Sequence, residues 1–278
     1  MRADLHIHSW VSDGTLSPAE ILDIAAAEGL DAIAITDHDL LEGARELAAL
    51  PQHPEVLRVS GVELDALEWG ANFHILAYGA DLYDEAFTAF VQADRALLEE
   101  VNDRLIEKMA TDVPGVSMAD YRAFSYPRGG GGWKALHYFM AKGLTESLGE
   151  GFGWYARYGH TNACVPFPSI AQVARAVHGA GGMAVLAHPG KVIPTGGLAF
   201  FRRRVEEALD MGLDGIECHY PSHGPAVTGI CLDLCRERGL LVTCGSDCHG
   251  AFEKTRIGQM DAELGSEVKD GKILPKAL

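Results

Sequence analysis

The sequence predicts an α/β fold in which about seven short strands form a closed or nearly closed barrel. Short apolar, β-prone runs alternate with amphipathic helical segments, which is typical of parallel strands joined by right-handed helical crossovers. Polar residues of the types that carry chemistry follow almost every one of these runs. The 278 residues, 47% of them hydrophobic, suffice for one domain of barrel size, with or without an insertion.

The expected strands are residues 3–5, 31–36, 56–60, 73–76, 183–187, 215–216 and 240–243. In barrels of this kind the active site is built from the loops that follow the carboxyl ends of the strands. We therefore expect the polar residues after these runs to meet at one rim.

Helix signals separate several of the strands. In Ser17-Pro18-Ala19-Glu20, a serine cap, a proline in the first turn and a glutamate three residues on predict a helix to about Glu28. Ser169 precedes a second helix that runs to about Gly179. The segments 202–211 and 228–238 have the same helical pattern.

Residues 87–160 interrupt this alternation. The segment 87–110 reads as one long charged helix, and a further helix is expected around 133–143. We predict that residues 1–86 and 161–278 form the barrel domain. Residues 87–160 then form a small helical insertion, or cap, over the barrel mouth.

The composition limits the partners. Lys and Arg number 23 against 39 Asp and Glu, a formal charge of −16, so a long nucleic acid is not expected to bind. A small anionic substrate is compatible, because bound divalent cations can reverse the local charge. No apolar run reaches membrane-spanning length, and the N-terminus lacks the apolar region of a signal peptide. The six cysteines read as reduced, buried thiols, which predicts a cytoplasmic protein. No membrane partner and no obligate protein partner are expected.

Nine residues are candidate metal ligands. His6 and His8 lie two apart at a strand end, so both imidazoles are expected on one face. Each residue alone has an ordinary interpretation, such as a turn for Asp13 or a core position for His74. Together they place histidines or carboxylates around one rim: His6, His8, Asp13, His38, Glu63, His74, His188, Asp247 and His249.

Nine ligands exceed what one ion needs, so two or three divalent ions are implied. Imidazoles and carboxylates without thiols suit Mn²⁺, Fe²⁺ or Zn²⁺. Clusters of this type stabilise both the attacking and the leaving oxygen in a displacement at phosphorus.

The segments DLHIHS, SDG, ITDHD, GVE, AHPG and GSDCHG, in this order, resemble the polymerase and histidinol phosphatase (PHP) family. The resemblance spans Asp4 to about Gly250, apart from the insertion. It implies a distorted seven-stranded β/α barrel and hydrolysis of a phosphoester by a metal-bound hydroxide.

The resemblance also implies three ligand sets. His6, His8, Glu63 and Asp247 would hold one ion. Glu63 would bridge to a second ion completed by His74 and His188. Asp13, His38 and His249 would hold a third. We further expect Glu63, Asp247 and His249 to act in catalysis, the last two by handling a proton.

The resemblance is closest to small phosphoesterases that act on nucleotides or short oligonucleotides and carry a helical insertion between the GVE and AHP segments. Many of them grip phosphate with an Arg-His element in the insertion, where this chain has Lys134 and His137. Lys191 stands where relatives often have Arg, and would bind a terminal phosphate. His223 follows a strand and is expected to line the pocket, or else to support it from behind or lie on the surface.

The predicted function is hydrolysis of a phosphate monoester, with a nucleotide or nucleoside bisphosphate as substrate. The alternatives are an exonuclease or phosphodiesterase on short oligonucleotides, a histidinol-phosphate phosphatase, and hydrolysis of C–N bonds as in related amidohydrolases. A non-catalytic, metal-binding regulatory module is the alternative from outside enzymes. It is opposed by the absence of an attached polymerase and by the presence of all nine ligand residues.

Overall fold

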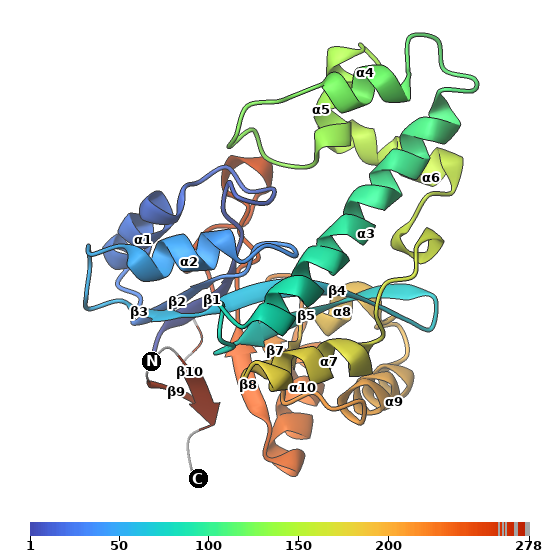
Figure 1. Ribbon diagram of the computed structural model, residues 1–278. Helices are drawn as coiled ribbons and strands as arrows, with labels where there is room; N and C mark the ends of the chain where they lie inside the picture. The colour runs from blue at the N-terminus through green and yellow to red at the C-terminus, as the bar shows by residue number, and fades with distance from the viewer. Residues whose placement is uncertain (261, 263, 265, 270–271, 276–278) are drawn as a thin grey trace.

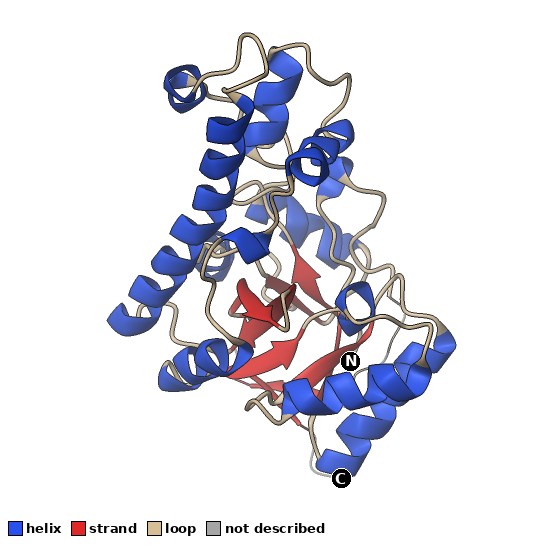
Figure 2. Ribbon diagram, turned by 90° about the vertical axis from the view of Figure 1, so that its right-hand side faces the viewer, coloured by secondary structure: helices blue, strands red, loops and turns tan. Residues whose placement is uncertain are grey.

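The protein has a mixed α/β fold with a three-stranded, a five-stranded and a two-stranded sheet. In the computed structural model, the residues described are 1–278 except 261, 263, 265, 270–271 and 276–278 (Figure 1). Strands occupy the centre and helices surround them (Figure 2). Among the described residues, no helix is both long and apolar enough to cross a membrane.

The three-stranded sheet is parallel throughout. Its strands and the helices between them are β1 (Ala3–Ile7), α1 (Pro18–Ala27), β2 (Ala32–Ile35), α2 (Glu42–Ala49) and β3 (Leu57–Val59). The capping box between Ser17 and Glu20 forms as the sequence predicts. Helix α2 was not expected from the sequence. Its Gly43 weakens the helical pattern, but a side chain there would collide with Asp37, because the helix packs closely on the loop after β2.

The second sheet has the order β4-β5-β6-β7-β8. Its strands are β4 (Gly61–Glu68), β5 (Ala71–Tyr78), β6 (Met183–Leu186), β7 (Gly215–His219) and β8 (Leu241–Cys244). The helices around it are α7 (Ile170–Gly179), α8 (Pro189–Val192), α9 (Leu198–Leu209) and α10 (Pro225–Arg238). A short antiparallel pair, β9 (Ser266–Lys269) and β10 (Lys272–Pro275), and a turn of 3₁₀ helix, η3 (Gly250–Phe252), complete this half.

The expectation of parallel strands throughout is wrong for β5, which runs antiparallel to both β4 and β6. Trp69 and Gly70 join β4 to β5 in a two-residue turn, and both have positive φ, 49° and 75°. That backbone is typical of a tight hairpin whose twist matches its strands. Glu63 is therefore the third residue of the long strand β4, and it does not end a preceding strand as the sequence indicated.

Isolated bridges join the two main sheets on both sides. Ile7 pairs with Cys248 and His38 pairs with Glu63, each in the parallel sense. The inner faces of the sheets share one hydrophobic cluster, in which the Tyr78 hydroxyl donates to the Leu5 carbonyl at 2.7 Å. The arrangement is barrel-like, although the sheets stay separate. The two bridges lie at the rim that carries the polar residues.

Residues 87–160 are mainly helical. The helices here are α3 (Glu85–Met109), α4 (Met118–Ala123), α5 (Lys134–Ala141), η1 (Gly149–Gly151) and α6 (Phe152–Tyr158), followed by η2 (Asn162–Cys164). Helices α4, α5 and α6 gather along the far half of α3, where they share a hydrophobic cluster of their own (Figure 1). The near half of α3 instead contributes Phe87 and Val91 to the hydrophobic cluster between the five-stranded sheet and its helices α7, α9 and α10. Helix α3 therefore packs against the barrel-like body at its start and against the other helices of the insertion at its end.

Candidate metal centre

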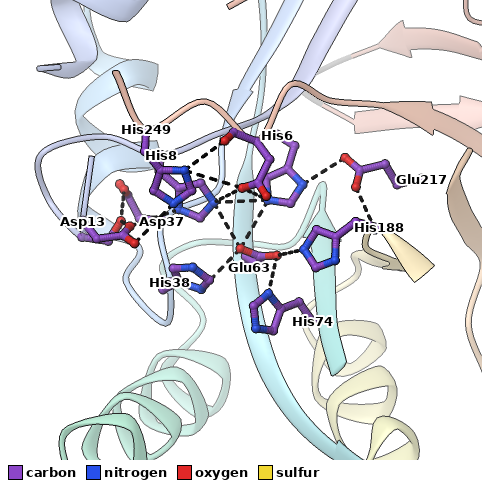
Figure 3. A network of polar contacts seen from close by, with 12 residues as sticks. His6, His8, Asp13, Asp37, His38, Glu63, His74, His188, Glu217 and His249 are labelled. Carbon is purple, nitrogen blue, oxygen red and sulfur yellow. Dashed lines mark hydrogen bonds and ion pairs between the residues drawn. The ribbon is translucent and has the colours of Figure 1, made fainter. Parts of the chain in front are cut away.

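The structure brings together all nine candidate ligands at one rim of the barrel-like body (Figure 3). They form overlapping groups whose ligand atoms lie within 4.8 Å of one another. Three groups correspond to the ligand sets expected from the sequence: His6, His8, Glu63 and Asp247; Glu63, His74 and His188; and Asp13, His38 and His249, here joined by His8. A fourth group of His38, His74 and Asp65 was not expected.

A shift in strand register turns two of the ligands inward. Upstream, Ala3 and Leu5 of β1 face the inner cluster, whereas Ile7 packs outward with α1. The pairing of β1 with β2 shifts between Asp4 and Ile7, as in a β-bulge. His6 and His8 therefore both point into the site.

Two further ligand candidates have unusual backbone conformations. His188, after β6, has φ of 24°, and Asp247, after β8, has φ of 52°. Positive φ is uncommon in residues other than glycine and concentrates at functional sites.

Glu63 lies at the centre of the group (Figure 3). Its side chain is fully buried. Its two oxygens face imidazole nitrogens at distances between 2.9 and 3.3 Å, from five histidines: His6, His8, His38, His74 and His188. A carboxylate in this position is suited to bridge two cations, because each oxygen faces a different set of nitrogens.

The remaining candidates extend the group on the side of His8. Asp247 Oδ1 lies 3.2 Å from His8 Nε2. Asp13 Oδ2 lies 3.3 Å from His249 Nε2, and Asp13 Oδ1 lies 3.5 Å from His8 Nδ1. His249 donates from Nδ1 to the Asp247 carbonyl at 2.9 Å, which directs its Nε2 toward Asp13.

The donor atoms fit divalent cations. The Nε2 atoms of His6 and His8 lie 3.2 Å apart, and Glu63 Oε2 is buried without a hydrogen-bond donor. Converging lone pairs and a buried, unpartnered carboxylate oxygen are unfavourable unless positive charge compensates them. Imidazole and carboxylate ligands without thiols provide the donor set for such ions.

The electrostatics of the group favour bound positive charge. Burial lowers the pKa of His38 to about 4 and that of His188 to about 3. Burial also disfavours the charged forms of His8 and His74, but the neighbouring carboxylates outweigh it and raise the pKa of each to about 10. The carboxylates therefore attract cations, while His38 and His188 stay neutral and keep lone pairs for coordination.

Glu217 is a buried carboxylate in contact with two candidate ligands, and the sequence reasoning missed it. It is fully buried behind His6, on the side away from Glu63 (Figure 3). Glu217 Oε1 accepts from His6 Nδ1 at 2.9 Å, and Oε2 accepts from the His188 amide at 2.8 Å. The first bond fixes the tautomer of His6 with its Nε2 lone pair toward the site. The available signal was a carboxylate directly after the apolar residues of an expected strand.

We expect the substitution Glu217→Gln to lower metal affinity or turnover by about 10- to 100-fold. The two bonds fall on different oxygens of Glu217, and glutamine replaces one of them with an NH₂ donor, so either His6 Nδ1 or the His188 amide loses its acceptor. Metal titration and phosphate-release assays would measure the loss. Glu42→Gln, at a largely exposed position on α2, is the matched control and is expected to behave as wild type. A Glu217→Gln protein with unchanged metal affinity and turnover would contradict the positioning role.

Two more buried carboxylates, also missed, hold the loops that carry ligands. Asp37 accepts from the amide and hydroxyl of Ser9 and from the hydroxyl of Ser12, at 2.8, 2.7 and 2.6 Å. Asp4 accepts from the Ser246 amide at 2.9 Å. These bonds position the turn before Asp13 and the loop before Asp247.

Of the residues expected to bind substrate, the structure brings Lys191 to the ligand group. Its ammonium lies 3.0 Å from Asp247 Oδ2. His223 donates from Nδ1 to the Cys218 carbonyl and accepts at Nε2 from the Gly190 amide, both at 3.1 Å. Both ring nitrogens are thus engaged, and His223 supports the loop after His188 from behind.

Lys134 and His137 have partners elsewhere in the insertion. The Lys134 ammonium lies 3.4 Å from the Arg122 carbonyl and above the ring of Tyr121. His137 Nε2 donates to the Gly131 carbonyl at 2.7 Å. None of their described hydrogen bonds reaches a candidate ligand. Trp133, the residue that precedes helix α5, faces the site instead, with its ring 5.3 Å from that of His38.

A cavity of about 500 Å³ opens beside the ligand group, between the rim and the insertion. His38, His74 and Asp65 form its floor. Asp65, the unexpected member of the fourth group, accepts from Asn72 Nδ2 at 2.6 Å and Asn162 Nδ2 at 3.0 Å, and lies 3.5 Å from His74. The cavity is placed to hold the organic part of a molecule whose reacting group lies among the ligands.

Comparison with known proteins places these features in a family. Residues 4–107 match the PHP domain. The chain is 30% identical to the 3′,5′-nucleoside bisphosphate phosphatase of Chromobacterium violaceum, over 91% of this chain and 89% of the relative. It is 28% identical to a 5′-3′ exoribonuclease of Haemophilus influenzae, over 77% of each chain. It is 29% identical to a phosphoribosyl 1,2-cyclic phosphate 1,2-diphosphodiesterase of Eggerthella lenta, over 91% of this chain and 95% of the relative.

A solved structure agrees with these matches. A protein of Bifidobacterium adolescentis, assigned as a metal-dependent phosphoesterase, superimposes with a TM-score of 0.73 at 26% identity, over 93% of this chain and 91% of that one. The resemblance drawn from the six sequence motifs is thereby confirmed, and the chain belongs to the PHP domain family.

Proposed function

We propose that this chain is a metal-dependent phosphoesterase that hydrolyses the phosphate monoester of a nucleotide or nucleoside bisphosphate. The observation that carries the proposal is the set of overlapping histidine and carboxylate groups that share Glu63 at one rim. The Chromobacterium violaceum relative, a 3′,5′-nucleoside bisphosphate phosphatase, supports the substrate class. The formal charge of −16 fits a small substrate better than a long nucleic acid.

The nine residues would hold two or three ions of manganese, iron or zinc. His6, His8, Glu63 and Asp247 would form the first set, and Glu63 with His74 and His188 the second. Asp13, His38 and His249 would form the third. Bound there, divalent ions lower the pKa of water and offset the charge on phosphoryl oxygens.

The chain's own residues would orient the phosphate and handle protons. Asp247 faces His6 and His8 with Oδ1, while its Oδ2 accepts from Tyr220 at 2.8 Å and from Lys191 at 3.0 Å. Burial and the Asp247 charge raise the pKa of Tyr220 well above its ordinary value, so its hydroxyl remains a donor. Lys191 and Tyr220 would bind phosphoryl oxygens beside Asp247, and Asp247 or His249 would take up or return the proton.

The barrel and the insertion would surround the candidate metal centre. The three-stranded and five-stranded sheets would together form the distorted barrel that the resemblance implies, and residues 87–160 would form the cap over its mouth. The barrel domain comprises residues 1–86 and 161–278. All six cysteines are free and all but Cys164 are buried, which supports a reducing, cytoplasmic setting.

A panel of substrates tests the proposal. Phosphate release is measured from mononucleotides, 3′,5′-bisphosphonucleosides, 5′-phosphorylated short oligoribonucleotides, histidinol phosphate and an aryl phosphate. We expect release from the nucleotide class with Mn²⁺, and loss of that release with chelator. Release that persists at full rate under chelation would overturn the proposal. Bound metal without any turnover would favour a non-catalytic module.

A second candidate function is exonucleolytic hydrolysis of short oligoribonucleotides. The Haemophilus influenzae relative, a 5′-3′ exoribonuclease, favours it. The same panel separates the two functions, because an exonuclease releases mononucleotides from the oligomers, whereas a monoesterase releases inorganic phosphate from the bisphosphates.

A further inference from the structure

The cavity beside the ligand group has an aromatic wall. Trp133, Phe152 and Tyr155 line it from the insertion, and Leu98 and Val101 line it from α3. Phe152 is 47% exposed, which is unusual for a phenylalanine, and its ring lies 6.3 Å from that of Tyr155. Aromatic faces of this kind hold flat, apolar rings by stacking.

The described lining of the cavity includes no lysine and no arginine, so no cationic side chain of either type faces it. An anion would therefore be held at the ligand group and beside Lys191, and the uncharged part of the substrate would enter the cavity. The volume of about 500 Å³ is within the usual range for a small-molecule site.

Oriented polar groups complete the cavity. Tyr155 donates its hydroxyl proton to Asn102 Oδ1, and Asn102 Nδ2 donates to the Leu98 carbonyl, which fixes both side chains. His160 donates from Nδ1 to the Tyr158 carbonyl, which leaves Nε2 as an acceptor. Asn72 Oδ1 is buried and has no hydrogen-bond partner. Acceptors held in this way suit the N–H groups on the edge of a heterocycle.

Asp65 is the carboxylate in the described cavity wall, and it lies 3.5 Å from His74. Its Oδ1 accepts from Asn72 and Asn162, whereas its Oδ2 is buried without a hydrogen-bond partner. Together with the aromatic faces, these acceptors favour a flat heterocycle that carries N–H donors.

We infer that this cavity is the nucleoside pocket, in which the base of the substrate stacks on Phe152 and Tyr155 beside Trp133. The inference rests on the proposed function and adds to it the part of the site that selects nucleotides over other phosphate esters. The insertion therefore determines specificity, while the rim carries the chemistry.

The test compares two phenylalanine substitutions. Phe152→Ala removes a stacking face from the cavity, and Phe200→Ala, at a 37% exposed position on α9, is the matched control. For each variant, kcat/KM is measured with adenosine 3′,5′-bisphosphate and with ribose 5-phosphate, which lacks a base. We expect the ratio of the two values to fall by about tenfold in Phe152→Ala, since base–aromatic stacking accounts for roughly five- to a hundredfold per base. Phe200→Ala is expected to keep the wild-type ratio. An unchanged ratio in Phe152→Ala overturns the inference.

Binding of adenosine and uridine, measured by calorimetry on the metal-loaded protein, separates this inference from the proposed function. The nucleosides are expected to bind wild type and Phe200→Ala with similar affinity, and to bind Phe152→Ala about tenfold more weakly. That result would support the nucleoside pocket even if no phosphate were released. In the opposite outcome, phosphate is released, but no nucleoside binds and substrates without a base react equally well. That outcome would support the phosphoesterase and refute the nucleoside pocket.

Discussion

The substitution Glu63→Ala is expected to reduce phosphate release by about a thousandfold, equivalent to about 4 kcal/mol, and to remove bound metal in parallel. Glu63 is fully buried and faces five imidazoles at 2.9 to 3.3 Å. Its loss leaves two of the three ligand sets without their shared carboxylate. The effect should therefore exceed that of removing any single histidine.

Metal content by elemental analysis and phosphate release on the best nucleotide substrate would measure this effect. Glu68→Ala is the matched control, because Glu68 ends the same strand, β4, and is outside the ligand groups. We expect Glu68→Ala to keep both metal and turnover. A Glu63→Ala protein that retains stoichiometric metal and wild-type turnover would falsify the assignment of Glu63 as the bridging ligand.

Removal of metal is expected to lower the melting temperature by about 10 °C. A ligand that binds only the folded state adds about 4 kcal/mol at 1,000 times its Kd, and for a chain of this size each kcal/mol shifts Tm by roughly 2–4 °C. The physical source is the set of buried carboxylates at the rim, Asp13, Glu63 and Asp247, whose mutual repulsion is offset when divalent cations bind.

Thermal unfolding of the same preparation with chelator, and then with Mn²⁺ or Zn²⁺ restored, checks this expectation. The gain should be small in Glu63→Ala and close to wild type in Glu68→Ala. It should also shrink progressively as pH falls below about 10, because protons compete with metal for His8 and His74, whose pKa values are raised to about 10 by the neighbouring carboxylates. Equal melting temperatures with and without metal would contradict a folded-state metal centre.

Much of the fold followed from local patterns. The capping boxes at Ser17 and Ser169 set the starts of α1 and α7 as expected. The hairpin between β4 and β5 was missed, because Trp69-Gly70 is not among the common hairpin dipeptides. Its antiparallel direction depends on two residues with positive φ and on pairing with β6 across more than a hundred residues of chain.

Part of the candidate site could likewise be predicted from the sequence, and part could not. The nine ligand residues could be proposed from their types and from their positions after apolar runs. Glu217 and Asp37 were missed, because a carboxylate after an expected strand has the same sequence signature whether it faces the ligands or stands behind them. Asp65 was missed because it lies within β4, which the sequence analysis did not expect, on the same face of the strand as Glu63. Lys134 and His137 were assigned by analogy to an element that this chain lacks, and their partners are decided by how α5 packs in the insertion.

The sequence by itself determined the family of this protein and its candidate ligands: histidines and carboxylates, without thiols, in an order typical of that family. Those properties depend on residue type and on spacing along the chain, which can be read locally. Only the tertiary structure decided that Glu63 is central, that Glu217 orients His6, and that an aromatic cavity adjoins His38 and His74. These features depend on the register of β1, the direction of β5 and the packing of α3 and α6, and each of them is set by contacts between residues far apart in the sequence.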